Sequence, residues 1–180
     1  METTSTPASA NSASTTSVAI RYGLLTGLIY IIYQFIIFVS GLEANTAAGW
    51  LGLAFPIGGI YLAHRYFKVQ NGGFMSYGQG LGIGMLVSMV SGLLTVFFNY
   101  LYRTLIDPEM NGRMLETVRA KMEEGGNMSD EQIESAVNMT AKFSSGPFSL
   151  VFGLLMALIS GLIISLIISA FTKHNRPEFE

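Results

Sequence analysis

The stretch NGGFMSYGQGLGIGMLVSMVSGLL, residues 71–94, has a glycine at every second position from Gly78 to Gly84 and then continues as an apolar run. A glycine-rich loop that binds a dinucleotide follows a strand, begins a helix and has an acidic residue about 20 positions later. No strand pattern precedes Gly78, and the next acidic residue is Asp107. The stretch therefore indicates a transmembrane helix whose glycines permit close contact with a neighbouring helix.

The composition of the whole chain is that of a membrane protein. Half of its 180 residues are hydrophobic and only 12% are charged, whereas a soluble domain carries about 25% charged residues. Four apolar runs reach the roughly 20 residues that a helix needs to cross a bilayer. We therefore expect an all-α integral membrane protein with four transmembrane helices in a bundle, at about residues 20–42, 47–67, 76–102 and 147–171.

Small residues recur at every fourth position along the third and fourth expected spans. Those of the third span are Gly80, Gly84, Ser88 and Gly92, and those of the fourth include Gly153 and Gly161. Small residues at this spacing let transmembrane helices pack closely, so we predict that the two spans pack tightly, against each other or against copies in a homo-oligomer. An alternative is that residues 72–82 are partly unwound and line a site at the cytoplasmic face, as broken helices do in transporters.

The expected spans contain little that could carry out chemistry. No Asp, Glu, Lys or Arg lies near the middle of a span, which is where ionisable residues mark functional sites in membrane proteins. His64 and His174 lie near span ends without a second ligand at helical spacing, and the chain has no cysteine. The net charge of −2 gives no reason to expect nucleic acid. We therefore expect no enzyme, no cofactor and no metal site.

Two uncharged polar residues, Gln34 and Asn99, lie within the first and third spans. Each is seven residues from a glycine of its own span, so both are expected to point into the bundle. We predict that they form interhelical hydrogen bonds. A second possibility is a polar pocket that holds a small ligand or a lipid headgroup, with the neighbouring residues Tyr30, Tyr33, Ser91 and Thr95.

The remaining segments are expected to lie outside the membrane. Residues 1–17 are rich in Ser, Thr and Ala and predict a disordered tail, followed by a membrane domain at 18–172 and a second tail at 173–180. Residues 103–146 predict two short amphipathic helices in a hairpin, because Pro108 interrupts the third helix and Ser129 with Gln132 forms a capping-box pattern. This insert would lie on the membrane surface or cap the bundle.

Basic residues near the span ends indicate the orientation in the membrane. The first link, residues 43–46, has none, whereas Arg65, Lys68 and Lys173 follow the second and fourth spans. Because cytoplasmic loops are rich in Lys and Arg, both termini are predicted to be cytoplasmic. The insert opposes this prediction, since it carries five basic residues: Arg103, Arg113, Arg119, Lys121 and Lys142.

Two stretches, residues 67–110 with NYLYRTLIDPEM at its end and the helix MSDEQIESAVNMTAKF, resemble the domain-of-unknown-function 4199 family. The resemblance covers about residues 18–172 and implies a four-span inner-membrane protein of bacteria, mainly Bacteroidetes, with no established activity. We expect a non-enzymatic interaction or structural protein, in contact with membrane lipids and with a homo-oligomer or membrane protein partner. The alternative is a transport accessory protein that binds a small molecule or lipid.

Overall fold

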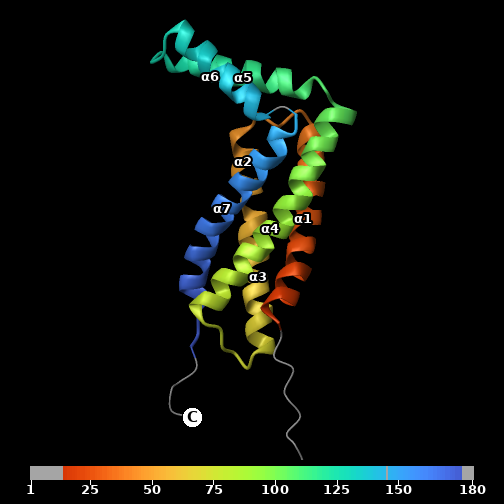
Figure 1. Ribbon diagram of the computed structural model, residues 1–180, viewed down its shortest axis with the longest axis vertical. Helices are drawn as coiled ribbons and strands as arrows, with labels where there is room; N and C mark the ends of the chain where they lie inside the picture. The colour runs from red at the N-terminus through yellow and green to blue at the C-terminus, as the bar shows by residue number, and fades with distance from the viewer. Residues whose placement is uncertain (1–13, 145, 176–180) are drawn as a thin grey trace, which may run out of the picture.

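The computed structural model describes residues 14–144 and 146–175, and this part of the chain is helical (Figure 1). Its elements in chain order are α1 (Thr15–Val39), α2 (Thr46–Gly52), α3 (Ala54–Gln70), α4 (Tyr77–Leu101), the π-helix η1 (Tyr102–Ile106), α5 (Met110–Gly125), α6 (Asp130–Ser144) and α7 (Phe148–Thr172). The strand-like feature of the described residues is one antiparallel bridge, in which the backbone N–H groups of Met75 and His174 each donate to the other residue's carbonyl at 2.8 Å.

Four segments are long and apolar enough to cross a membrane: Thr15–Val39, Thr46–Gln70, Tyr77–Ile106 and Phe148–Thr172. Their outward faces expose large apolar side chains, among them Val151 at 70% and Phe171 at 86% of full exposure. Apolar surface of this extent would be a liability in water and is typical of helices in contact with lipid. For the described residues, the prediction of an all-helical fold with four segments able to span a membrane is therefore confirmed.

The first two spans differ from their predicted boundaries. Helix α1 begins at Thr15, so residues 15–17 of the predicted disordered tail are helical, and residues 1–13 lie outside the described part of the chain. The second span consists of two helices, α2 and α3, which meet at Leu53. Pro56 explains the break, because a proline has no N–H to donate and is tolerated only in the first turn of a helix.

The glycine-rich stretch is regular helix from Tyr77 onward, so the alternative that residues 72–82 are partly unwound holds only for the first five of them. Only residues up to Ser76 are non-helical, with Gly72 and Gly73 at positive φ. The helix begins at a capping box: the Gln79 N–H donates to the Ser76 hydroxyl at 3.2 Å, and the Ser76 N–H donates to the Gln79 side-chain oxygen at 2.9 Å. The pattern Ser-x-x-Gln is a recognised start signal that the sequence analysis overlooked here.

The third span runs four residues beyond its predicted end at Tyr102. The π-helix η1 continues α4 to Ile106, and the chain becomes extended at Asp107, with φ −138° and ψ 77°. The helix therefore ends at the interruption predicted from Pro108 and not at the predicted span boundary, because a residue that precedes proline avoids helical geometry. The last residues of the third span thus include Arg103, which the predicted boundaries assigned to the extramembrane insert.

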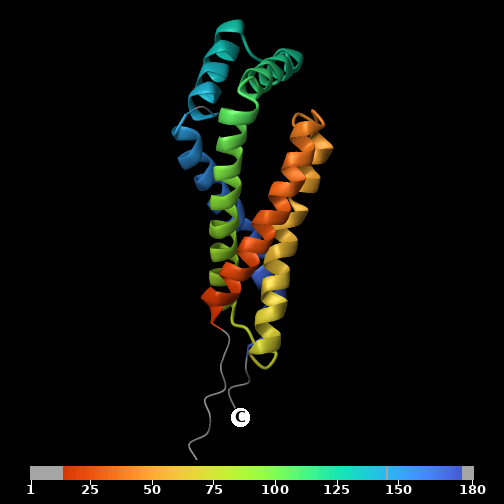
Figure 2. The ribbon, with the colours of Figure 1, turned by 90° about the vertical axis from the view of Figure 1, so that its right-hand side faces the viewer.

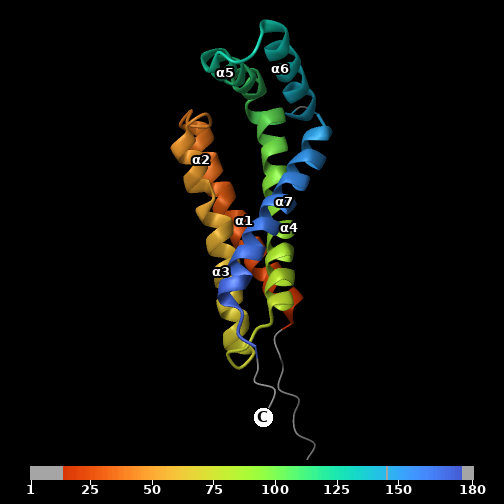
Figure 3. The same ribbon diagram turned by 90° about the vertical axis from the view of Figure 1, so that its left-hand side faces the viewer.

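Helix α4 lies at the centre of the bundle, with α1 and α7 packed along it and α3 in contact with all three. Both ends of the described chain and the α3–α4 loop lie at one end of the molecule, whereas α5 and α6 lie across the other end (Figure 1). Near α5 and α6, the α1–α2 pair diverges from α4 and α7 (Figures 2 and 3). Aromatic rings bridge part of this divergence, since the ring centres of Phe38 and Tyr102 are 4.9 Å apart.

Helices α5 and α6 lie side by side and form what we call the cap. Gly126 ends α5 in the left-handed conformation, with φ 62°. Ser129 begins α6: its N–H donates to the Gln132 side chain at 2.9 Å, and the Gln132 N–H donates to its hydroxyl at 3.3 Å. Within the cap, Met110, Ile133 and Val137 are buried.

Candidate functional site

The small-residue faces of α4 and α7 face each other within one chain. The facing pairs are Gly80 with Ser169, Gly84 with Ser165, Ser88 with Gly161, Gly92 with Ala157, and Val96 with Gly153. Each step of four residues along α4 corresponds to a step of four residues back along α7, as expected for antiparallel helices. A Cβ added at Gly92 would lie only 2.9 Å from the Ala157 Cβ. These glycines thus serve contact between helices, and the chain itself covers the two faces.

His64 lies inside the bundle, although its place in the sequence is near the end of the second span. It is fully buried, with Nε2 2.8 Å from the Gly80 carbonyl and Nδ1 2.9 Å from the Thr172 hydroxyl. A carbonyl can only accept, so Nε2 carries a hydrogen and the side chain ties α3 to α4 and α7. A helical-face argument could have placed this histidine correctly, because the buried residues Ile60 and Phe67 lie four and three positions away on the same face.

Gln34 and Asn99 meet across α1 and α4. The Asn99 side-chain amide donates to the Gln34 side-chain oxygen at 2.9 Å and to the Thr95 carbonyl at 2.8 Å. Of the companions considered for a polar pocket, Tyr33 donates to the Ala48 carbonyl at 2.6 Å and Ser91 to the Val87 carbonyl at 2.8 Å. The pair does line a pocket, but one on the side of the cap, which Tyr30, Tyr33, Ser91 and Thr95 do not line.

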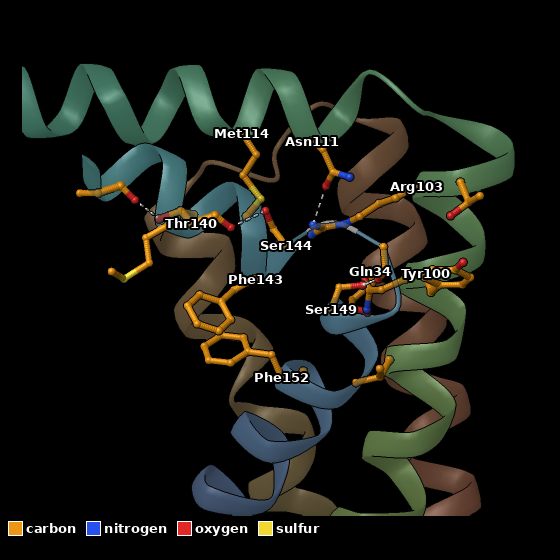
Figure 4. Close-up of a pocket in the computed structure, with 17 residues that line it drawn as sticks. Gln34, Tyr100, Arg103, Asn111, Met114, Thr140, Phe143, Ser144, Ser149 and Phe152 are labelled. Atoms are coloured by element: carbon orange, nitrogen blue, oxygen red, sulfur yellow. Dashed lines mark hydrogen bonds between the residues drawn. The ribbon is translucent and has the colours of Figure 1, made fainter. Parts of the chain in front are cut away.

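This pocket, which we call the Arg103 pocket, has a volume of about 710 Å³ and lies between the bundle and the cap (Figure 4). Its lining comes from α1, α4, η1, α5, α6 and α7. Figure 4 shows Gln34, Arg103, Asn111 and Ser149 toward the α4 side, together with the Tyr100 ring, and the rings of Phe143 and Phe152 on the opposite side, below Thr140 and Ser144. Residues distant in sequence thus form one cavity with a polar end and an apolar end.

Arg103 is the one charged residue among the described residues that line the pocket. Its Nη1 donates to the Asn111 side-chain oxygen at 3.0 Å, whereas its Nε is buried and has no hydrogen-bond partner in the described part of the chain. The ion pairs of the described residues all involve Arg113, so no carboxylate balances this guanidinium. Because arginine stays protonated in proteins, the polar end of the pocket carries a fixed positive charge.

The π-helix sets the position of Arg103. A π-turn adds a residue to the helical turn, which changes the direction of the side chains that follow it, and such turns are frequent at functional sites. Arg103 and Thr104, both in η1, line the pocket next to Tyr100 of α4. Arg103 was not predicted as a site residue, although an arginine directly next to the predicted end of a transmembrane span was a signal for it.

The apolar end of the pocket is built by aromatic rings from α6 and α7. The ring centres of Phe143 and Phe152 are 5.0 Å apart with a 30° angle between the planes. Met139 and Met114 also line this region, and methionine adapts readily to irregular apolar ligands. A second hollow of about 860 Å³ shares Met139 and Phe143 with the pocket and has Lys142 on its wall.

An ion-pair cluster joins the cap to the α1–α2 link. The Arg113 guanidinium donates to both carboxylate oxygens of Asp107, at 2.5 and 3.1 Å, and lies 3.7 Å from a carboxylate oxygen of Glu43. The hydrogen bonds from Arg113 lower the pKa of Asp107, and those to Asp107 raise the pKa of Arg113. Arg113 is therefore neutralised by its own partners, in contrast to Arg103.

The described residues contain no group of three or more His, Cys, Asp or Glu side chains that could hold a metal ion. Comparison with known proteins adds a family but no activity. A family profile with the description "Protein of unknown function (DUF4199)" matches residues 21–174. Searches of curated proteins and of solved structures find no match.

Proposed function

We propose, from the premise that the chain belongs to the DUF4199 family of proteins of unknown function, that it is a non-enzymatic membrane protein that binds an amphiphilic molecule. The ligand would lie in the Arg103 pocket, between the four-helix bundle and the cap. The family supplies no activity, so the proposal rests on one observation: a cavity of about 710 Å³ with a charged polar end and an aromatic end. Pockets for small ligands commonly have volumes of about 300–1,000 Å³.

The surroundings of the pocket favour a ligand that comes from the membrane. The pocket begins where the third span ends, at Arg103 and Thr104, and the adjoining hollow is lined by Phe148 at the start of α7. Phe148 itself is 67% exposed, as expected for a side chain at the lipid boundary. A lipid or lipid-like molecule could therefore reach the pocket without first dissolving in water.

A binding role accounts for the side chains in the pocket better than catalysis does. Arginine holds its proton and cannot act as a general acid or base near neutral pH. The Thr140 hydroxyl donates to the Ala136 carbonyl at 2.9 Å, and the Ser144 hydroxyl donates to the Thr140 carbonyl at 2.7 Å. These hydroxyls are committed to helix carbonyls with no base beside them, an arrangement that suits ligand contact more than nucleophilic attack.

We further propose that the protein resides in the bacterial inner membrane with both termini in the cytoplasm, so that the cap and the pocket face the periplasm. Arg65, Lys68 and Lys173 support this orientation, because the C-terminal ends of α3 and α7, which carry them, lie at the same end of the molecule as both ends of the described chain. The chain has no cysteine, so single cysteines can be introduced at Ser135 and Asn175. A membrane-impermeant maleimide added to spheroplasts should label the Ser135→Cys variant only. Labelling of the Asn175→Cys variant instead would show that the protein has the opposite orientation.

Binding is tested by native mass spectrometry of the full-length protein after gentle extraction from its own membrane. We expect one amphiphilic molecule per chain. Ser149→Trp should abolish this occupancy, because Ser149 lines the pocket and indole would fill it. Ser160→Trp is the matched control, since Ser160 lies on the same helix and is exposed. Equal occupancy in both variants, or none in the parent, would refute the proposal.

A role in protein contacts is our second candidate. Its original motive, the small-residue faces of α4 and α7, is weakened because these faces cover each other within one chain. The observation that still favours it is the polar outer surface of the cap, where long stretches of α5 and α6 are exposed. The same mass spectra test it, since a reproducible protein partner or a defined homo-oligomer would support this role over ligand binding.

A further inference from the structure

We propose that the Arg103 pocket selects a single-chain anionic amphiphile, with its carboxylate or phosphate head on the Arg103 guanidinium and its chain against Phe143 and Phe152. This inference rests on the proposed function, because it requires that the pocket binds a ligand. It goes further by naming the chemical class of the head and its direction in the pocket. The argument has three steps: the free donors, the charge and the shape.

The free donors of Arg103 lie along one edge of its guanidinium group. Nη1 is engaged by Asn111, whereas Nε is buried without a hydrogen-bond partner and no hydrogen bond of Nη2 is present among the described residues. Nε and Nη2 form one side of the planar group, with two N–H bonds that run parallel. This fork matches two oxygens of one carboxylate or phosphate, which is the geometry of the strongest arginine contacts.

The charge of the pocket selects against neutral and cationic heads. No Asp or Glu is found among the described residues that line it, and the neighbouring cation Arg113 is already paired with Asp107. Arg103 is only partly buried, but burial of even part of a charged group is costly unless a counter-charge or hydrogen bonds compensate it. An anionic head supplies both, whereas a quaternary ammonium head would meet the Arg103 charge unopposed.

The shape of the pocket favours one chain. The Phe143–Phe152 pair lies across the cavity from Arg103 (Figure 4), so a ligand with its head on Arg103 has its apolar part beside the rings. The volume of about 710 Å³ lies within the range for one small ligand, about 300–1,000 Å³. This size favours a fatty acid or a single-chain phosphate over a phospholipid with two chains.

The test uses the full-length protein in phosphatidylcholine nanodiscs and counts bound probe by native mass spectrometry. The probes are palmitate, hexadecyl phosphate, the neutral monopalmitoylglycerol, hexadecyltrimethylammonium and inorganic phosphate. We expect one palmitate or hexadecyl phosphate per chain and at least about tenfold weaker binding of the neutral and cationic probes. Binding of only one anion would identify the head as carboxylate or as phosphate, and either result supports the inference.

Variants of Arg103 distinguish the contribution of the ligand's head group to binding from the contribution of the rest of the pocket. Arg103→Gln should weaken the binding of the anionic probes about 10- to 100-fold, as expected for loss of a charge-assisted hydrogen bond. The affinity for the neutral probe should stay unchanged. Arg103→Lys keeps the charge without the fork, so its affinity for anions should lie between those of Arg103→Gln and the parent. Ser149→Trp should exclude every amphiphile, and Ser160→Trp should exclude none.

Each failure has a distinct meaning. If the parent binds the neutral probe as tightly as the anions, the inference about the charge of the head group is wrong, but the proposed binding pocket stands. This comparison uses the parent protein alone, so it does not depend on whether a variant folds. If inorganic phosphate alone binds as tightly as hexadecyl phosphate, the chain contributes nothing and the assignment of an amphiphile is wrong. If no amphiphile binds the parent, the proposed function itself is wrong.

Discussion

The antiparallel contact between α4 and α7 makes a quantitative prediction about Gly84. A Cβ added there would overlap the Ser165 hydroxyl oxygen, would lie 2.7 Å from the Ser165 Cβ and would lie 3.2 Å from the Ile60 Cγ2. The hydroxyl can rotate, but the Ser165 Cβ is fixed to the α7 backbone, so α7 has to move away. This movement would also open the contacts one turn to either side, where a Cβ added at Gly80 would lie 2.9 Å from the Ser169 hydroxyl oxygen and a Cβ added at Gly161 would overlap the Ser88 Cβ.

The expected cost of Gly84→Ala follows from two opposing effects. Overpacking of a tight contact costs about 1–3 kcal/mol. Replacement of glycine by alanine within a helix stabilises the helix by up to about 1 kcal/mol, because alanine has the higher helix propensity. The net loss of stability relative to the parent should therefore be about 0–2 kcal/mol, and relative to a glycine-to-alanine change without overpacking about 1–3 kcal/mol. Gly82→Ala is the matched control, because it lies on the same helix with nothing within 4 Å of the added Cβ, and it should be neutral or slightly stabilising.

The assay is unfolding of the purified protein in mixed micelles by titration with SDS, followed by far-ultraviolet circular dichroism. Ser165→Gly should restore the stability of Gly84→Ala, since it exchanges the two facing residues and returns the space. The coupling between the two substitutions in a double-mutant cycle should then be at least about 1 kcal/mol. If Gly84→Ala is as stable as Gly82→Ala, or if Ser165→Gly gives no rescue, the helices do not pack in this register.

Three further predictions use the same unfolding assay. His64→Leu should cost about 1–3 kcal/mol, because the Gly80 carbonyl loses its buried donor; an unchanged stability would contradict the buried position of His64. Gln34→Leu and Asn99→Leu should show coupling of about 0.6–1.7 kcal/mol, the range for hydrogen bonds between membrane helices. Arg113 lowers the pKa of Asp107 in the folded protein. The stability that this ion pair contributes is therefore fully present above the unfolded pKa of about 3.9 and is lost as the pH falls through the lower folded pKa. Asp107→Asn should remove this acid-dependent loss of stability.

The sequence is sufficient to predict the four long apolar helical segments of this protein, but not the break between α2 and α3 or the π-helix η1. Four apolar runs of about the length of a bilayer crossing give the four spans, because backbone groups in lipid have to be satisfied within a helix. The four-residue spacing from Gly80 to Gly92 marks a face for helix contact, and Pro108 and Ser129 mark the ends of helices. These features depend on neighbouring residues and on the bilayer, so they can be read without knowledge of the partners.

Only the tertiary structure decides which faces meet. By its sequence, Gly84 could pack against α7 of the same chain or against a second copy of the protein. Hydropathy cannot distinguish these two arrangements, because lipid-facing and helix-facing positions are both apolar in a transmembrane helix. His64 is buried because α3, α4 and α7 converge on it. The Arg103 pocket requires a π-turn and side chains that lie as far apart in sequence as Gln34 and Phe152. Local patterns determine helices, whereas a site formed between helices depends on distant contacts that no local pattern contains.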